Sequence, residues 1–399
     1  MSDTKESFSP NANLHHAIAL LDDTVFSPTP LPMGLPTLGI GEKGTLDLLA
    51  PHVLGKAAHL DDSLALAHMD PPTPWITWAM ALWNARLNQN LLHPATAPFA
   101  KEAEERVINW LTPFFGMQGG HFCSGSTLAN LTALWAARDI ANVTKVVASE
   151  AAHISIAKAA HILGLSYESI STDAHGVLDP KQLGDLSHTC LVLTAGTTTL
   201  GAIDPLHLIG TAAWTHVDAA WAGALRLSPK YAFLLENIEQ ADSIALSAHK
   251  WFFQPKDSAL IFFKALQKAN EALAFGGGYL ATPNIGVQGS RGAAAIPLLA
   301  TLLAWGKEGL IERIEQTMQT AQTIALGIAR EPRLEVLASG TTGINVFRPK
   351  HMETQTLYDT LPKGMFSTCT INGTLWIRSV SANPLANAEA ILEILHKHL

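Results

Sequence analysis

Two residues of opposite charge, each close behind a short apolar run, have the types and spacing for joint chemistry. Asp218 ends the run Thr215–Asp218, and Lys250 comes shortly after the next run, Ser243–Leu246. A lysine amine forms a Schiff base with an aldehyde, and a carboxylate holds a pyridine nitrogen protonated. The resulting pyridinium withdraws electrons from a substrate carbon far better than a neutral ring. The pair therefore predicts a site for pyridoxal phosphate (PLP).

The elements that position this pair are the strands of a predicted parallel sheet. Apolar and β-branched runs alternate with helical stretches from residue 120 to 265, which is typical of a mainly parallel α/β sheet buried on both faces. Ligands bind such sheets beyond the carboxyl ends of the strands. Four strand ends supply candidate residues there: His153, Thr197 with Thr198, Asp218, and His249 with Lys250. The predicted strands are Lys145–Ser149, Leu191–Ala195, Thr215–Asp218, Ser243–Leu246 and Ala259–Phe263.

A turn of small residues, Gly125-Ser126-Thr127, precedes a predicted helix. Small residues let a phosphate approach the backbone, and the free N–H groups of a helix N-terminus attract it. The two hydroxyl side chains could equally cap the helix, and both roles use the same N–H groups. No Walker A lysine and no G-x-G-x-x-G is present, which disfavours a nucleotide.

The chain resembles the group II PLP-dependent decarboxylases, which include aromatic amino acid, glutamate, histidine and diaminobutyrate decarboxylases. Three strings carry the resemblance: GTTTLGAIDP at 196–205, HVDAAWAG at 216–223 and AHKW at 248–251. Weaker matches lie at 153–160, 289–291, 376–378 and 383–384, in the order of the family and from about residue 65 onward.

The resemblance implies the fold and the roles of single residues. It implies the fold-type I aminotransferase architecture, a homodimer, and an N-terminal arm that crosses to the partner. Lys250 would carry the Schiff base, Asp218 would pair with the pyridine nitrogen, and His153 would stack on the ring. Gly125, Ser126, Thr127 and Ser247 would bind the phosphate with His249 nearby, and Thr198 and Ala220 would line the ring.

One segment departs from the family pattern. Longer members have a mobile loop whose tyrosine protonates Cα, whereas residues 281–288 here form a short segment without tyrosine. His249, Tyr279, Lys250 and water remain candidate proton donors. Loss of the loop tyrosine in the family favours oxidative deamination, so decarboxylation-dependent oxidation stays open.

The candidate substrate residues are Arg378, Tyr279 and Met69. Arg378 lies on a predicted strand where related enzymes hold the substrate carboxylate, although a decarboxylase gains little from gripping the group it expels. Met69 and Trp75 would form an apolar wall near the entrance, and Asp70 could meet a basic side chain. These residues favour an aromatic or cationic amino acid over glutamate.

Composition excludes several classes of function. The 399 residues are 48% hydrophobic and 15% charged, as in a globular protein, and the net charge of −8 gives no footprint for nucleic acid or an anionic membrane. The apolar stretch 293–305 is too short to span a bilayer. Three unpaired cysteines and a polar N-terminus without the apolar core of a signal peptide predict a cytoplasmic protein. No histidine or cysteine spacing suggests a metal site.

We expect three regions: an N-terminal arm with helices at 1–95 that contacts the partner, a PLP-binding α/β domain at 96–292, and a small α+β domain at 293–399. The helices are predicted over about Trp75–Asn90, Ala97–Thr112, 294–329 and Ala386–His396, and the later strands over Leu334–Leu337, Gly343–Phe347 and Thr374–Ser379.

Three functions remain in view. The first is a PLP-dependent L-amino acid decarboxylase, a carboxy-lyase of amino acid metabolism. The second is a carbon–carbon lyase of the sphingosine-phosphate lyase type, suggested by 290–292 and 254–258, although no basic cluster for a substrate phosphate is evident. The third is a PLP-binding homologue with little activity, which the intact Lys250 and Asp218 argue against.

Overall fold

The structure is a computed structural model that describes residues 12–22, 27–278, 280 and 283–399. The chain divides into two compact units, one through His59 and one from Leu60 onward. The first unit contains helices α1 (Ala12–Ala19) and α2 (Gly41–Val53), which contact each other. His16 Nε2 lies 2.6 Å from Asp47 Oδ1 between these helices. Among the described residues of this unit only Ala50 is buried, so it has almost no core of its own.

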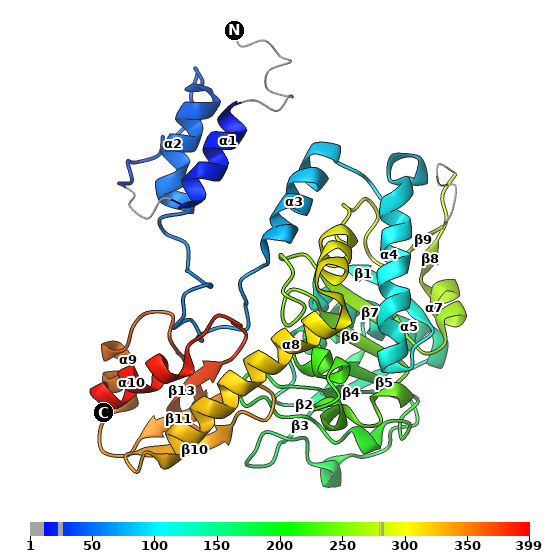
Figure 1. Ribbon diagram of the computed structural model, residues 1–399. Coiled ribbons are helices and arrows are strands. Elements are labelled where there is room, and N and C mark those ends of the chain that lie inside the picture. Colours follow the sequence, from blue (N-terminus) through cyan, green and yellow to red (C-terminus); the bar gives the residue numbers. More distant parts are fainter. Residues whose placement is uncertain (1–11, 23–26, 279, 281–282) are drawn as a thin grey trace. The chain divides into compact units, whose positions relative to one another are not determined.

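The second unit is built around a seven-stranded sheet in the order β1-β7-β6-β5-β4-β2-β3 (Figure 1). Strands β6, β5, β4, β2 and β3 are parallel, whereas β7 runs antiparallel to both β6 and β1. The expected mainly parallel α/β sheet is therefore confirmed. The strands are β1 (Gly119–Cys123), β2 (Lys145–Ser149), β3 (Ser166–Ile170), β4 (Thr189–Thr194), β5 (Trp214–Asp218), β6 (Ser243–Ser247) and β7 (Ala259–Phe263).

Both faces of this sheet are covered, because alternate residues of each strand point to opposite sides. On β2, Val146 and Ala148 pack with helices α5 (Ser126–Ala141), α6 (Ser155–Ile162) and α7 (Leu266–Leu273). Val147 of the same strand joins a second core on the other face, together with α4 (Pro98–Leu111) and α8 (Ala295–Arg330). Burial on both faces explains why these strands are continuous apolar runs.

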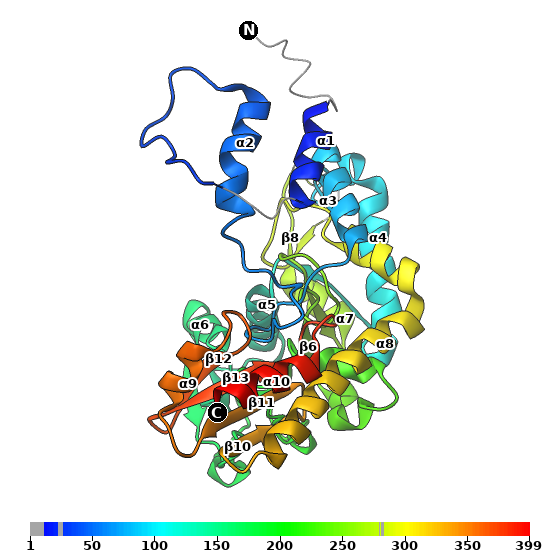
Figure 2. The same ribbon diagram turned by 60° about the vertical axis from the view of Figure 1, so that its left-hand side comes forward.

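Helix α8 links the large sheet to a smaller sheet (Figures 1 and 2). Its first part packs on α3 (Trp75–Leu87) and α4, and its last part on β10 and α10. Gly306 interrupts it with φ 64° and ψ −176°, a conformation open only to glycine. The small domain has the antiparallel order β10-β11-β13-β12. Its elements are β10 (Leu334–Ser339), β11 (Ile344–Pro349), α9 (Thr354–Thr360), β12 (Ser367–Ile371), β13 (Thr374–Val380) and α10 (Ala388–His398).

Five strands were not expected from the sequence: β1, β3, β12 and the short strands β8 and β9. Strand β1 begins with two glycines, while β3 is a polar edge strand that is largely exposed. Strand β9 (Asn284–Ile285) lies within the segment that departs from the family pattern and pairs with β8 (Ala274–Phe275).

Candidate active site

The carboxylate of Asp218 lies at the carboxyl end of β5 and is nearly buried, with 4% of the residue exposed. Its Oδ1 accepts a hydrogen bond from the backbone N–H of Ala220 at 3.1 Å. Its Oδ2 accepts one from Asn130 Nδ2 at 2.9 Å. Strand pairing places Asp218 beside Thr194 of β4 and Ala245 of β6. The carboxylate is therefore held from two sides at the predicted edge of the sheet.

The Gly125-Ser126-Thr127 turn reaches the same edge from β1. Ala259 of β7 pairs with both Ser247 and Cys123, so the ends of β6 and β1 lie on either side of β7. Ser126 Oγ and Ser247 Oγ are 2.5 Å apart. Helix α5 starts at Ser126 without a side-chain cap, and a Cβ placed on Gly125 would meet no atom within 4 Å. An uncapped helix start, two hydroxyls and open space suit a phosphate group.

Lys250 follows β6, with its amine among charged neighbours. Burial lowers the pKa of Lys250, while the nearby carboxylates of Asp218 and Asp70 oppose that shift. The charges of Lys256 and Arg378 lower it further. A lowered pKa leaves more of the amine uncharged, and the uncharged form is the nucleophile that attacks an aldehyde.

His249 precedes the lysine and is held by one backbone contact. Its Nδ1 lies 3.1 Å from the carbonyl oxygen of Ser258, which can only accept, so Nδ1 carries the hydrogen. Burial, together with the ammonium groups of Lys256 and Lys250, lowers the pKa of His249 to about 4. The ring is therefore neutral at pH 7, and its Nε2 is an acceptor.

His153 follows β2 at the same edge and has an exposed ring. Its Nδ1 lies 2.8 Å from Ser155 Oγ, and Ser155 Oγ accepts a hydrogen bond from Asn130 Nδ2 at 2.9 Å. Because Asn130 also donates to Asp218, a single hydrogen-bond path joins His153 to the carboxylate. The structure thus brings together two residues that are far apart in the sequence.

The remaining predicted residues are less closely tied. Thr198 and Ala220 are half-buried at the ends of β4 and β5. Arg378 on β13 is half-buried; its Nη1 donates to Ser367 Oγ at 3.2 Å, and its buried Nε has no partner among the described residues. Met69 is half-buried against the core, and Asp70 forms an ion pair with Lys256. Tyr279 lies outside the described residues.

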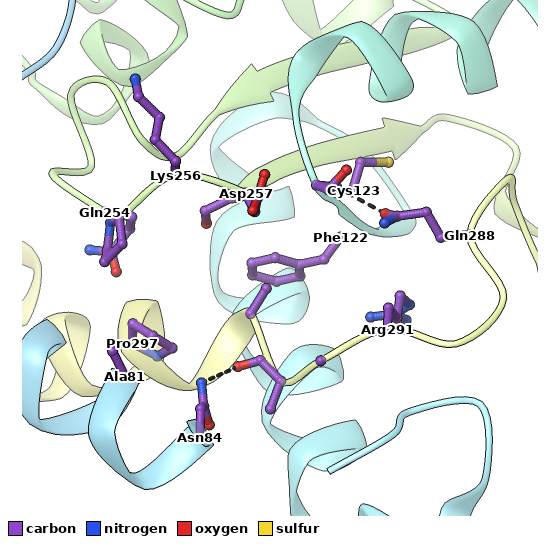
Figure 3. A pocket seen from close by; sticks show the side chains of 16 residues that line it. Ala81, Asn84, Phe122, Cys123, Gln254, Lys256, Asp257, Gln288, Arg291 and Pro297 are labelled. Atoms are coloured by element: carbon purple, nitrogen blue, oxygen red, sulfur yellow. Dashed lines mark hydrogen bonds between the residues drawn. The ribbon is translucent and has the colours of Figure 1, made fainter. Parts of the chain in front are cut away.

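A cavity of about 570 Å³ adjoins this site without including Lys250, Asp218 or His153. Figure 3 shows Phe122 between the Gln254–Asp257 side of its wall and the Arg291 side. Ser124, just before the Gly125–Thr127 turn, donates its backbone N–H to Gln288 Oε1 at 2.9 Å. The cavity therefore lies next to the Gly125–Thr127 turn, and the residues with candidate chemical roles, Lys250, Asp218 and His153, lie outside its lining.

Sequence reasoning missed several residues that organise the site. Asn130 lies one helical turn after Ser126 on the same face of α5, a spacing that could have indicated it. Arg291 forms a paired contact with Glu104, with Nη2 2.7 Å from Oε1, which fixes the segment after Gln288 to α4. This pairing gives Arg291 a structural role.

The donor set fits PLP group by group. The turn at Gly125 suits the phosphate, the Asp218 carboxylate suits a protonated ring nitrogen, and the half-buried Lys250 with its lowered pKa suits the aldehyde. Ala220 contacts Asp218 directly through its backbone N–H, and His153 is connected to Asp218 through Ser155 and Asn130.

Comparison with known proteins agrees with this chemistry. Residues 57–350 match the pyridoxal-dependent decarboxylase conserved domain. The L-2,4-diaminobutyrate decarboxylase of Rhizobium meliloti is 32% identical over 79% of this chain and 70% of that protein. The aromatic-L-amino-acid decarboxylase of Bacillus atrophaeus is 26% identical over 91% of this chain and 86% of its own length.

A solved structure shows the same fold. The glutamate decarboxylase domain of the diaminobutyrate-pyruvate transaminase and L-2,4-diaminobutyrate decarboxylase from Vibrio parahaemolyticus superposes with a TM-score of 0.82. The match covers 97% of this chain and 94% of that chain at 23% identity, so it supports the fold alone. The domain match and the relative at 32% identity show that this chain belongs to the pyridoxal-dependent decarboxylase family, a family of PLP-dependent carboxy-lyases.

Proposed function

We propose that this enzyme removes the α-carboxylate of an L-amino acid as CO2, with Lys250 as the residue that forms the Schiff base with PLP. The observation that carries the proposal is the half-buried Lys250, whose amine of lowered pKa lies near the doubly hydrogen-bonded Asp218 carboxylate. When bound, PLP supplies an electron-withdrawing ring that takes up the electron pair left as CO2 departs.

The chain's own residues would bind and orient the cofactor. Asp218 would hold the ring nitrogen protonated through a charge-assisted hydrogen bond in a nearly dry environment. His153 would cover one face of the ring. Ser126, Thr127 and Ser247, with the N–H groups at the start of α5, would bind the phosphate.

The proton that returns to Cα must come from a group that can donate. Neutral His249 has its hydrogen on Nδ1, where it is bonded to Ser258, so its Nε2 can accept a proton but not give one. We therefore favour Lys250 Nζ over His249 as the donor. An amine of lowered pKa releases a proton more readily than an ordinary lysine.

We propose a cationic or aromatic side chain on the substrate. Asp70 is close enough to Lys250 to raise its pKa, and it is paired with Lys256. A substrate ammonium could take the place of Lys256 on Asp70. The relative at 32% identity is named for L-2,4-diaminobutyrate, and another is named for aromatic amino acids.

A substrate panel tests the decarboxylase proposal. Purified enzyme loaded with PLP should release CO2 from L-2,4-diaminobutyrate or from an aromatic L-amino acid, and Lys250→Ala should lose both the release and the visible cofactor absorbance. Asp70→Asn should raise KM for diaminobutyrate but not for an aromatic substrate. An aldehyde without CO2 would favour the lyase alternative, and a cofactor band with no product from any substrate would favour the silent homologue.

We also propose a homodimer. Helix α3 exposes Trp75, Trp83 and Leu87 at 70%, 59% and 61%, although its other side packs on α8. A helix that is apolar all round is normally covered on all sides. The first unit, with little core of its own, needs cover as well.

Sedimentation velocity tests the dimer. The protein should sediment as a dimer, and Trp83→Gln combined with Leu87→Gln should shift it toward the monomer. Phe233→Gln, at an equally exposed phenylalanine outside α3, should leave the dimer intact. A monomeric wild-type protein would refute the proposal.

A further inference from the structure

Asn130 is fully buried on α5 and uses both ends of its amide. Its Nδ2 donates to Asp218 Oδ2 and to Ser155 Oγ, each at 2.9 Å. Its Oδ1 lies 3.0 Å from His216 Nε2. One side chain therefore contacts three polar groups that come from β5 and from the start of α6.

The chemistry of these partners fixes which way the amide points. A carboxylate only accepts, so the nitrogen of Asn130 must face Asp218 and its oxygen must face His216. His216 then donates from Nε2. Burial lowers the pKa of His216 to about 4, so the ring is neutral. With Nε2 donating, Nδ1 accepts from Ser243 Oγ at 2.9 Å, and the Ser243 carbonyl oxygen at 3.2 Å receives no hydrogen from this ring. Trp214 Nε1 donates in turn to Ser243 Oγ at 3.0 Å.

The other branch sets the direction of hydrogen bonding at His153. Ser155 Oγ accepts from Asn130, so its own hydrogen is available for His153 Nδ1 at 2.8 Å. The backbone N–H of Ser155 points to the same nitrogen at 3.2 Å. Two donors converge on Nδ1, which must therefore be an acceptor. The hydrogen of the imidazole tautomer that fits these contacts is therefore on Nε2.

We propose that Asn130 is a positioning residue that orients the Asp218 carboxylate and the His153 ring together through one buried amide. Every donor in the path from Trp214 to His153 then has an acceptor. If the donor and acceptor atoms of any one side chain in this path were exchanged, two donors or two acceptors would face each other. The proposal rests on the roles proposed above for Asp218 and His153. With Oδ2 held by Asn130 and Oδ1 by Ala220, the carboxylate cannot rotate freely, and the ring of His153 is held in the same frame.

The decisive variant is Asn130→Asp, which keeps the shape of the side chain but replaces the two N–H donors of the amide with at most one O–H donor, when the new carboxyl is protonated. Thr132→Val is the matched control, since Thr132 is also buried on α5 and its hydroxyl contacts the Leu128 carbonyl and the Cys123 thiol, neither of which belongs to the path through Asn130. Ser155→Ala is a milder variant that cuts only the His153 branch.

Two measurements separate positioning from mere stability. The first is the dissociation constant for PLP, followed by cofactor absorbance. Asn130→Asp should weaken binding about ten- to a hundred-fold, while Thr132→Val should stay near wild type. The second is ¹⁵N NMR of histidine-labelled apoprotein, with the His153 signals assigned from His153→Gln. Asn130→Asp and Ser155→Ala should both move the Nδ1 shift from its wild-type value, because the hydroxyl donor is reoriented in the first variant and lost in the second, while the backbone N–H of Ser155 still donates to this nitrogen.

An unchanged His153 Nδ1 signal in Ser155→Ala, or wild-type PLP affinity in a folded Asn130→Asp, would overturn the proposal. If Asn130→Asp does not fold, the Ser155→Ala signal decides alone. The apoprotein spectra need no catalysis, so they remain decisive even if no substrate releases CO2. Conversely, if the wild type releases CO2 and Asn130→Asp keeps the wild-type PLP affinity, only the positioning role of Asn130 is refuted.

Discussion

Breaking the ion pair between Arg291 and Glu104 should destabilise the fold. The Glu104 side chain is 9% exposed and that of Arg291 is 22% exposed, so the remaining charge would be poorly solvated. Removal of one partner of a buried pair costs about 3–5 kcal/mol, and the partial exposure of Arg291 points to the lower end, about 3 kcal/mol. With a urea dependence of about 3 kcal/mol per M, Arg291→Met should unfold at about 1 M less urea.

A double-mutant cycle measures whether the pair itself causes this loss. The double variant Arg291→Met with Glu104→Leu should lose less free energy of unfolding than the sum of the two single variants, because it leaves no unpaired charge buried. Urea unfolding followed by tryptophan fluorescence and circular dichroism gives the four midpoints. Lys397→Met is the control, since its pair with Glu393 is exposed and should shift the midpoint little. Arg291→Met with no larger shift than this control, or additive single changes, would refute the reasoning.

Three further predictions follow from buried groups. Burial raises the pKa of Asp204 to about 6 from 3.8, so its protonated form stabilises the fold. This stabilisation is full below pH 3.8 and is lost as pH rises through 6. Asp204→Asn should remove up to about 3 kcal/mol of this pH dependence, measured by urea midpoints at pH 4.5 and 7. A Cβ on Gly120 would lie 1.8 Å from the Ile261 carbonyl oxygen, so Gly120→Ala should prevent stable folding. A Cβ on Gly125 would meet no atom within 4 Å, so Gly125→Ala should keep the wild-type melting temperature and weaken PLP binding. Equal melting temperatures of the two variants would contradict this. Burial raises the pKa of Cys123 to about 12 and also that of Cys190, so Ellman's reagent at pH 8 should label neither in the native state and all three cysteines in urea; rapid native labelling of more than one thiol would refute this.

Strands buried on both faces were predictable from the sequence. The bounds of β2 and β7 agree with the apolar runs at both ends, because every residue of such a strand is selected for burial. Strand β1 was missed because its glycines disfavour a strand, yet Gly120 is needed where the backbone approaches Ile261 closely. Strand β3 was missed because its edge position leaves it polar and exposed.

The candidate site divides in the same way. Asp218 and Lys250 stand out because each follows a strand, and position in a parallel sheet can be inferred from the runs alone. Asn130 could not be assigned, since its contacts depend on how α5 docks against β5 and α6. The acceptor state of His249 Nε2 likewise depends on a carbonyl group nine residues later, which no motif specifies.

The position of β1 in the sheet has a consequence for the order of folding. Strand β1 is the first of the seven in sequence, but its partner β7 is the last. Pairing between β5 and β6 closes only the connection between them, which contains short 3-10 helices, whereas closure of β1 onto β7 spans the whole domain and is entropically slower. A nascent chain synthesised as far as Ser258 would already contain the strands that carry Asp218 and Lys250. The Gly125–Thr127 turn follows β1, which would still lack its partner β7. The proposed phosphate site should therefore be the last part of this domain to form.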